Sequence, residues 1–218
     1  MAEPGIPPAR LAMAAKAVHS VLLKKKISHS FLGGYEIQLF GFKRHTKDVD
    51  VELSLPMLMS ASDVLKLFEA GGFKVFPPDP TKPITGLRAL YEGTDADGTF
   101  FVGIDVLISG HEQAYIKLPA RPIDLKVEGE LLPFFPKTHL FISKIICCAR
   151  RGKTRDLSDV VMLYKGWLSE LDVNKIKSKL KLSDKAAIEK QWPRDRGDED
   201  IPLDEFYEII DKVFGFLA

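Results

Sequence analysis

The sequence has no long apolar run and very little cysteine, and each shortage excludes a class of protein. None of its apolar stretches approaches the roughly 20 residues that a membrane-spanning helix needs. The two cysteines, Cys147 and Cys148, are adjacent and cannot form a disulfide framework, so we expect buried free thiols in a reducing compartment. Residues 1–10 lack the basic and apolar segments of a secretory leader. We therefore expect a cytosolic or nuclear protein that does not enter a membrane.

Metal-binding histidines, internal repeats and a strong charge of one sign are also lacking. The five histidines do not have the spacing of zinc ligands, so a zinc site is not expected. The net charge is +1, and overall charge therefore neither favours nor excludes a polyanionic partner. With 45% hydrophobic and 28% charged residues, the composition is that of an ordinary globular protein rather than a disordered one.

The periodicity of apolar residues predicts an α+β fold with two domains. We expect a mixed β-sheet flanked by helices in residues 1–130 and a helical bundle in residues 131–218. The Asp-Gly pair at the end of residues 94–98 predicts a hairpin between the strands on either side. The expected helices cover 8–26, 35–42, 56–70 and, with a break at Gly152, most of 137–217; the expected strands cover 28–34, 48–53, 73–76, 87–93 and 99–109.

Three carboxylates occupy every second position of the segment DVDVEL, namely Asp48, Asp50 and Glu52. Because side chains alternate along a strand, Asp48 and Asp50 project to one side, about 7 Å apart. Asp105 lies between apolar neighbours in another expected strand, where an aspartate is costly to bury unless it is paired or ligates a metal. Three such carboxylates can hold one or two Mg²⁺ or Mn²⁺ ions together with phosphate oxygens.

A second interpretation of this segment is an exposed strand face that nearby basic residues neutralise. Lys43, Arg44 and Lys47 are close enough in sequence to serve that purpose. For Glu52 we expect a position beyond the metal site and an ion pair with a basic residue. Gly33 and Gly34 favour the metal-site interpretation of the aspartates. We expect them to end a strand just before a short helix, where glycine lets a ligand approach the backbone closely.

The combined pattern resembles the DNA polymerase beta-like nucleotidyltransferase superfamily. After the glycine pair comes the motif R-x-T-x-D-h-D-h, here Arg44, Thr46, Asp48 and Asp50, and later an h-D-h strand around Asp105. The second half is similar to the minimal nucleotidyltransferases related to abortive-infection toxins, through Lys144 and the segment RGKTRDLSD at 151–159. The similarity covers about residues 30–165. One departure is Gly34, where many members of the superfamily have a serine whose hydroxyl contacts phosphate.

The resemblance implies transfer of a nucleoside monophosphate from an NTP to a hydroxyl acceptor, with release of pyrophosphate. It implies Mg²⁺ or Mn²⁺ as cofactor and, as acceptor, an RNA or tRNA end, a protein or a small molecule. The domain at 131–218 would pack on the core and complete the nucleotide site. By the same resemblance, Asp48, Asp50 and Asp105 are the catalytic residues and metal ligands, whereas Gly33, Gly34, Arg44, Thr46, Lys144 and Arg151 contact the nucleotide.

Other functions are open on the sequence alone. A module with this fold can bind nucleotide or a partner without turnover, because fold does not guarantee activity. The basic segment ARRGKTR at 149–155 can serve an RNA-binding protein. Asp156 and Asp159 fit local ion pairing at a helix start as well as a functional role. The loops at 77–86 and 109–122 are where we expect specificity to be determined.

Overall fold

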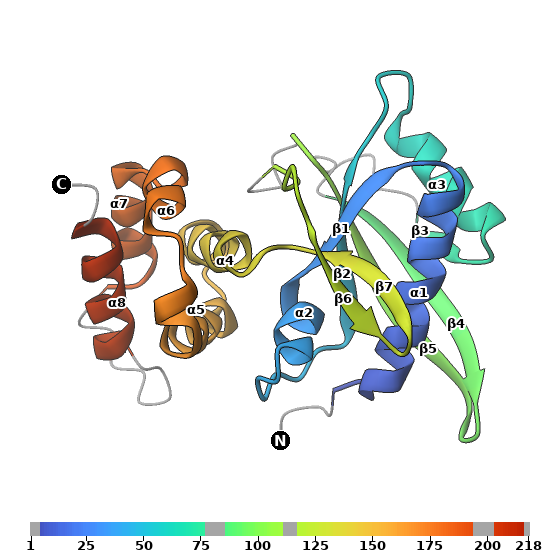
Figure 1. Cartoon of the computed structure of the whole chain (residues 1–218), viewed down its shortest axis with the longest axis horizontal. Coiled ribbons are helices and arrows are strands. Elements are labelled where there is room, and N and C mark those ends of the chain that lie inside the picture. The colour runs from blue at the N-terminus through green and yellow to red at the C-terminus, as the bar shows by residue number, and fades with distance from the viewer. Residues whose placement is uncertain (1–4, 77–85, 111–116, 194–202, 216–218) are drawn as a thin grey trace. The chain divides into compact units, whose positions relative to one another are not determined.

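The computed structural model describes residues 5–76, 86–110, 117–193 and 203–215. The chain forms two compact units, Met1–Phe135 and Pro136–Ala218 (Figure 1). The first unit contains the sheet and three helices, and the second is helical, which confirms the α+β class. None of the helices within these ranges combines the length and the apolar character that crossing a bilayer requires.

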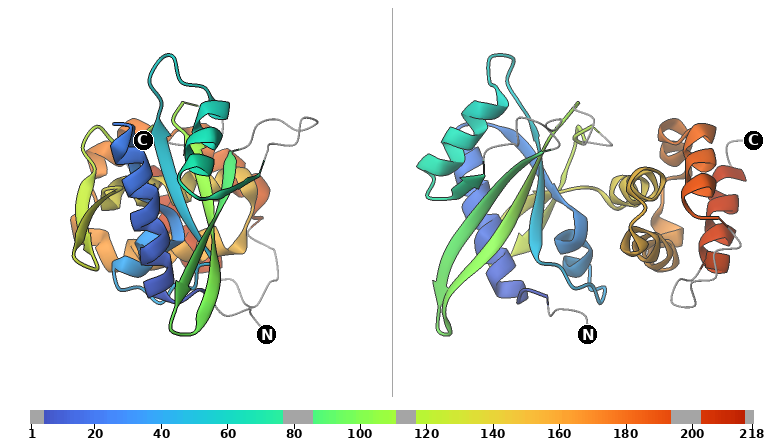
Figure 2. Two further views of the ribbon diagram at one scale, coloured as in Figure 1. Left: turned by 90° about the vertical axis from the view of Figure 1, so that its right-hand side faces the viewer. Right: turned by 180° about the vertical axis from the view of Figure 1, so that it is seen from behind.

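A seven-stranded mixed sheet with the order β3-β4-β5-β2-β1-β7-β6 forms the first unit. The central strand β2 runs antiparallel to β1 and parallel to β5, and β1 runs parallel to β7. The pairs β3–β4, β4–β5 and β6–β7 are antiparallel, and β4 and β5 form the hairpin that the Asp-Gly pair predicts (Figure 2). The strands are β1 Ser28–Leu32, β2 Asp48–Ser54, β3 Lys74–Phe76, β4 Leu87–Asp95, β5 Gly98–Ile108, β6 Ile123–Val127 and β7 Glu130–Phe134.

Strands β6 and β7 are not among the strands that the sequence predicts. Both are short, and they are stabilised by pairing with each other and by the parallel contact of Phe134 with Phe31 of β1. Such a distant partner leaves no local signature in the sequence. The sheet therefore continues to Phe134, past the domain boundary expected at residue 130.

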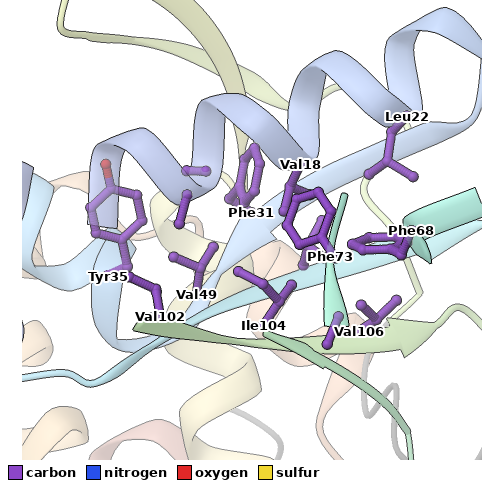
Figure 3. Packing of buried hydrophobic residues seen from close by; sticks show 14 of the residues in the cluster. Val18, Leu22, Phe31, Tyr35, Val49, Phe68, Phe73, Val102, Ile104 and Val106 are labelled. Atoms are coloured by element: carbon purple, nitrogen blue, oxygen red, sulfur yellow. The ribbon is translucent and has the colours of Figure 1, made fainter. Parts of the chain in front are cut away.

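One face of the sheet packs under helices α1 (Pro8–Lys24) and α3 (Ala61–Ala70), and we call it the core face. Figure 3 shows Val18 and Leu22 of α1 above Ile104 and Val106 of β5. The apolar residues of β2 and β5 alternate onto this face, so every second residue of both strands is directed to the opposite face. This alternation leaves the aspartates of the two strands on one common surface.

Helix α3 begins at Ala61, later than the predicted start at residue 56. Ser60 and Asp63 form a reciprocal capping box, in which the Asp63 amide donates to Ser60 Oγ at 3.2 Å and the Ser60 amide donates to the Asp63 carboxylate at 2.9 Å. The pair fixes the helix start at that point. Helix α2 (Gly33–Leu39) follows β1 directly, so the glycine pair expected to end the strand instead begins the helix, two residues before the predicted start at residue 35.

The second unit consists of α4 (Lys137–Arg151), α5 (Thr154–Trp167), a short 3-10 helix (Leu168–Glu170), α6 (Val173–Lys179), α7 (Leu182–Gln191) and α8 (Leu203–Gly215). Gly152 has a positive φ of 58°, which breaks the helical run at the predicted position. Cys147 and Cys148 are buried free thiols, as expected, and the Trp192 indole donates to the Cys148 carbonyl at 3.1 Å. These contacts tie the end of α7 to α4.

Candidate active site

The aspartates of β2 and β5 lie on the face of the sheet opposite the core face, which we call the acidic face. In the parallel register, Asp50 pairs with Asp105, and Asp48 pairs with Gly103. Because neighbouring strands are about 4.8 Å apart, the side chains of Asp50 and Asp105 start from adjacent points. All three aspartates are partly exposed, whereas the alternating residues of both strands are buried. The two strands therefore bring the three predicted carboxylates to one surface.

Gly33 and Gly34 lie against this group of carboxylates. A Cβ atom on Gly33 would be 2.0 Å from Asp50 Oδ2, and one on Gly34 would be 2.7 Å from Thr46 Oγ1. Gly33 also has a positive φ of 81°, a backbone conformation that side chains rarely tolerate. Both glycines are buried. Their established structural effect is to let Asp50 and Thr46 approach the start of α2.

Thr46 and Arg44 lie close to Gly34. The buried Thr46 hydroxyl donates to Asp48 Oδ1 at 2.9 Å, which fixes the orientation of that carboxylate. The Ile6 amide donates to the Thr46 carbonyl at 2.9 Å, which holds the connector in place. The Arg44 guanidinium contacts the His45 carbonyl and would lie 3.6 Å from a Cβ on Gly34. The motif residues before β2 therefore lie beside the glycine pair.

Arg88 belongs to the site and is not among the residues that the sequence predicts. It lies on β4 directly opposite Asp105, with Nε donating to Oδ1 at 2.9 Å and Nη2 donating to Oδ2 at 3.4 Å. The hydrogen bond that Arg88 donates to Asp105 raises the pKa of Arg88, and the charges of Asp105, Asp48 and Asp50 add to this effect. A single arginine in the otherwise apolar start of β4, LRAL, is the sequence signal that could have identified it.

Glu52 lies on β2 with Asp48 and Asp50, but in a buried part of the acidic face. Its side chain is 1% exposed, and its hydrogen-bond partners are the Ser109 hydroxyl and the Leu118 backbone, not the basic residue expected from the sequence. Burial raises its pKa to about 7, because these two hydrogen bonds only partly offset the loss of hydration. Within the described part of the chain, Glu52 Oε1 and the neighbouring Ser30 Oγ lack hydrogen-bond partners.

The carboxylates provide the oxygen ligands that Mg²⁺ and Mn²⁺ prefer, but they do not enclose a metal ion by themselves. No group of three or more His, Cys, Asp or Glu side chains in the described ranges is arranged to hold one. Asp105 is engaged by Arg88, and Asp48 is engaged by Thr46. Mg²⁺ is commonly held by one or two carboxylates together with substrate phosphates, and the present residues fit that type of site.

Lys144 and Arg151 form a separate cluster of charges in the helical unit. The ammonium group of Lys144 is buried and lies 2.8 Å from Asp159 and 3.6 Å from Asp156. Burial alone would lower the pKa of Lys144, but the two aspartates outweigh it and raise the pKa. Arg151 binds both carboxylate oxygens of Asp156, at 2.7 and 2.8 Å. The helix-start aspartates thus make ion pairs between α4 and α5.

The sequence-predicted site residues therefore fall into two groups. Seven of them, together with Arg88, gather at the start of α2, the connector before β2, and strands β2, β4 and β5 of the first unit, whereas the other two form the charge cluster of the second unit. Segments 77–85 and 111–116, which include most of the expected specificity loops, lie outside the described residues. The first group consists of Gly33, Gly34, Arg44, Thr46, Asp48, Asp50 and Asp105.

Comparison with solved structures shows that the chain has a nucleotidyltransferase-like fold. An antigenic nucleotidyltransferase-like protein from Paracoccidioides brasiliensis matches with a TM-score of 0.57 and 17% identity, over 71% of this chain and 75% of its own. The protein JHP933 from Helicobacter pylori matches with a TM-score of 0.54 and 15% identity, over 99% and 95%. Another H. pylori protein, described provisionally as a nucleotidyltransferase, matches with a TM-score of 0.54 and 16% identity, over 97% of each chain.

Sequence comparison adds no closer relationship. No protein-family model matches the chain, and no curated protein matches it significantly. The fold agrees with the superfamily resemblance that the motifs carry.

Proposed function

We propose that the chain is a metal-dependent nucleotidyltransferase, which moves a nucleoside monophosphate from an NTP to a hydroxyl acceptor. The observation that carries this proposal is the placement of Asp50 beside Asp105, with Asp48 on the same face and the glycine pair in contact. The fold supports it, because one structural neighbour is described as nucleotidyltransferase-like. Carboxylates from two strands on one surface suit chemistry that depends on positioning and on neutralising charge.

In the proposed reaction, the acceptor oxygen attacks the α-phosphorus, the bond to the bridging oxygen breaks, and pyrophosphate leaves. Asp48 and Asp50 hold Mg²⁺ or Mn²⁺, which would neutralise negative charge on the phosphates. Asp105 lies on the strand farther from the glycine pair, where it would be the third metal ligand and would take the proton of the acceptor hydroxyl. Gly33 and Gly34 leave room for the triphosphate near the backbone. Thr46 donates to Asp48 Oδ1 and would hold this carboxylate in place when a metal binds.

For Arg44 we propose a contact with the phosphates, and the position of its guanidinium near Gly34 supports this. For Lys144 and Arg151, a nucleotide contact remains a prediction. Lys144 is almost completely buried among carboxylates, whereas 39% of the Arg151 side chain is exposed. Of the two, Arg151 is the better candidate for contact with a ligand.

The proposal is tested by incubating the purified chain with each labelled NTP, Mg²⁺ or Mn²⁺ and a cell extract. We expect label transfer and pyrophosphate release, both reduced at least about 100-fold by Asp48→Asn or Asp50→Asn. The control is Asp124→Asn, which neutralises an exposed strand aspartate on β6 and should leave activity unchanged. An absence of transfer to any acceptor, or equal transfer by the Asp50 variant, contradicts the proposal.

The second candidate is a nucleotide-binding or interaction module without turnover. The observation that favours it is the engagement of Asp105 by Arg88, which leaves the third carboxylate occupied. In that case calorimetry would show tight NTP binding that does not depend on metal and does not change in Asp50→Asn. A nucleotidyltransferase should instead lose metal-dependent NTP binding in this variant.

A further inference from the structure

Arg88 lies beside the proposed metal site and occupies its third carboxylate. The two residues are direct partners in the antiparallel register of β4 and β5, and two hydrogen bonds of 2.9 and 3.4 Å join the guanidinium to both oxygens of Asp105. Asp105 is in turn the register partner of Asp50. Three neighbouring strands therefore place Arg88, Asp105 and Asp50 in one row across the acidic face.

The charge of Arg88 acts on the whole group of carboxylates. Its pKa is raised first by Asp105 and further by Asp48 and Asp50, so all three lie within its electrostatic reach. The Arg88 side chain is 73% exposed, and that of Asp105 is 30% exposed. The guanidinium can therefore leave the carboxylate and enter water without a large movement of the backbone.

Stabilisation of the fold is a weak explanation for this pair. Ion pairs at such exposure contribute little to stability, because water competes for both groups. Arg10 offers a contrast in the same unit, since it pairs with Asp95 and also packs on the ring of Phe100 at 4.9 Å. Arg88 instead lies near three carboxylates, and its positive charge reduces the repulsion among them.

We propose that Arg88 occupies Asp105 in the metal-free protein, so that a divalent cation must displace Arg88 from this carboxylate in order to bind all three aspartates. This inference rests on the proposed function. The guanidinium takes a lone pair on each oxygen of Asp105, and its positive charge repels a cation at the same carboxylate, so metal and guanidinium compete for Asp105. Arg88 thus lowers the affinity for free metal, and it is a positioning residue rather than a metal ligand.

Removal of the guanidinium should strengthen metal binding in the absence of nucleotide. For Arg88→Gln we expect the affinity for Mn²⁺ to rise roughly 3- to 10-fold, the range for loss of one nearby charge at a solvent-exposed site. Arg88→Lys keeps the charge but not the paired hydrogen bonds, and it should give a smaller gain. The gain in Arg88→Gln should depend on Asp105.

The experiment is a Mn²⁺ titration of the full chain without nucleotide, followed by the electron paramagnetic resonance signal of free Mn²⁺. The variants are Arg88→Gln, Arg88→Lys, Asp105→Asn and the double variant of Arg88→Gln with Asp105→Asn. Lys66→Gln is the charge-matched control, since this exposed lysine lies on α3, which packs on the core face. Thermal denaturation of each variant verifies that it is folded.

The expected result is a gain in Arg88→Gln that falls to less than half in the Asp105→Asn background, with no gain in Lys66→Gln. An equal gain in both backgrounds overturns the proposal, because Arg88 would then act only through its general charge. No gain in Arg88→Gln overturns it as well. If the unaltered chain binds no Mn²⁺, with or without ATP, the metal site of the proposed function fails and this inference fails with it.

Discussion

The carboxylate of Asp50 lies directly against the backbone of Gly33, so closely that a Cβ there would be 2.0 Å from Oδ2. The Asp50 carboxylate can therefore occupy this position only because residue 33 is a glycine. A side chain at this position would have to rotate Asp50 away from the acidic face. The contact links the backbone at the start of α2 to the geometry of the proposed metal site.

For Gly33→Ala we expect an activity loss of about 100-fold, because displacement of a reacting group by about 1 Å has effects of that size. Gly41→Ala is the matched control. Gly41 has a similar φ of 88°, but a Cβ there would meet no atom within 4 Å. Both variants should lose some stability from the left-handed backbone, and only Gly33→Ala should lose activity. Equal activity losses would contradict the contact with Asp50.

The hydroxyl of Thr46 is expected to matter for activity more than for stability. Thr46→Val keeps the volume of this buried side chain but removes the hydrogen bond to Asp48 at 2.9 Å. Because a hydrogen bond to a charged group is worth about 1.5–3 kcal/mol, we expect kcat/KM to fall about 10-fold or more. Thr46→Ser keeps the hydroxyl and should restore most of the activity. Similar rates for the two variants would show that Asp48 does not need this bond.

The buried carboxyl of Glu52 should make the chain less stable as pH rises. Its pKa is about 7 in the folded state, against 4.5 as the ordinary value, so the folded chain holds a proton that the unfolded chain releases. The contribution of the protonated Glu52 to the free energy of unfolding is fully present below pH 4.5. It is lost as pH rises through 7, and the loss amounts to about 3 kcal/mol.

Chemical denaturation between pH 4.5 and 8 measures this loss. Glu52→Gln should remove this part of the pH dependence, since an amide cannot ionise. Glu69→Gln, which changes an exposed glutamate on α3, should leave the pH dependence as it is. A Glu52→Gln variant with the same pH profile as the unaltered chain would refute the assignment.

The charge cluster of the helical unit should be sensitive to the loss of Lys144. Lys144→Met leaves the buried Asp159 without its 2.8 Å partner, and we expect the helical unit to lose about 3–5 kcal/mol of stability. Lys212→Gln is the control, because it removes an exposed partner of Glu208 on α8 and should have little effect.

Arg151→Gln distinguishes a structural role from nucleotide binding. Asp156 would keep Lys144 at 3.6 Å, so the loss of stability should be smaller than in Lys144→Met. A rise in the KM for NTP at a temperature where the variant is still fully folded would assign Arg151 to the nucleotide. An unchanged KM would leave the residue with its ion pair alone.

Much of the fold follows from local patterns in the sequence. The alternation in DVDVEL predicts β2, and the Asp-Gly pair predicts the β4–β5 hairpin, because both signals lie within a few residues. Strands β6 and β7 are missing from the prediction, since β7 pairs with β1, which is distant in sequence, and β6 pairs with β7. The start of α3 was predicted too early, because the capping box at Ser60 outweighs the apolar periodicity before it.

Some site residues also follow from local sequence patterns, whereas others depend on how distant strands pair. Asp48, Asp50 and Thr46 lie in one short motif, so the sequence predicts that they are close together. The importance of Arg88 depends on which residue it faces across the sheet, and the sequence does not state the register. The sequence predicts that Glu52 pairs with a basic residue, but its hydrogen-bond partners are Ser109 and Leu118, which follow β5 in the chain.

The central position of β2 couples ligand binding to completion of the sheet. Asp50 and Asp105 become neighbours only when β5, which follows α3, β3 and β4 in the chain, aligns parallel to β2. A partly folded chain with an unpaired β5 has no shared surface for a cation. Any ligand that bridges the two strands will therefore raise the melting temperature of the entire first unit.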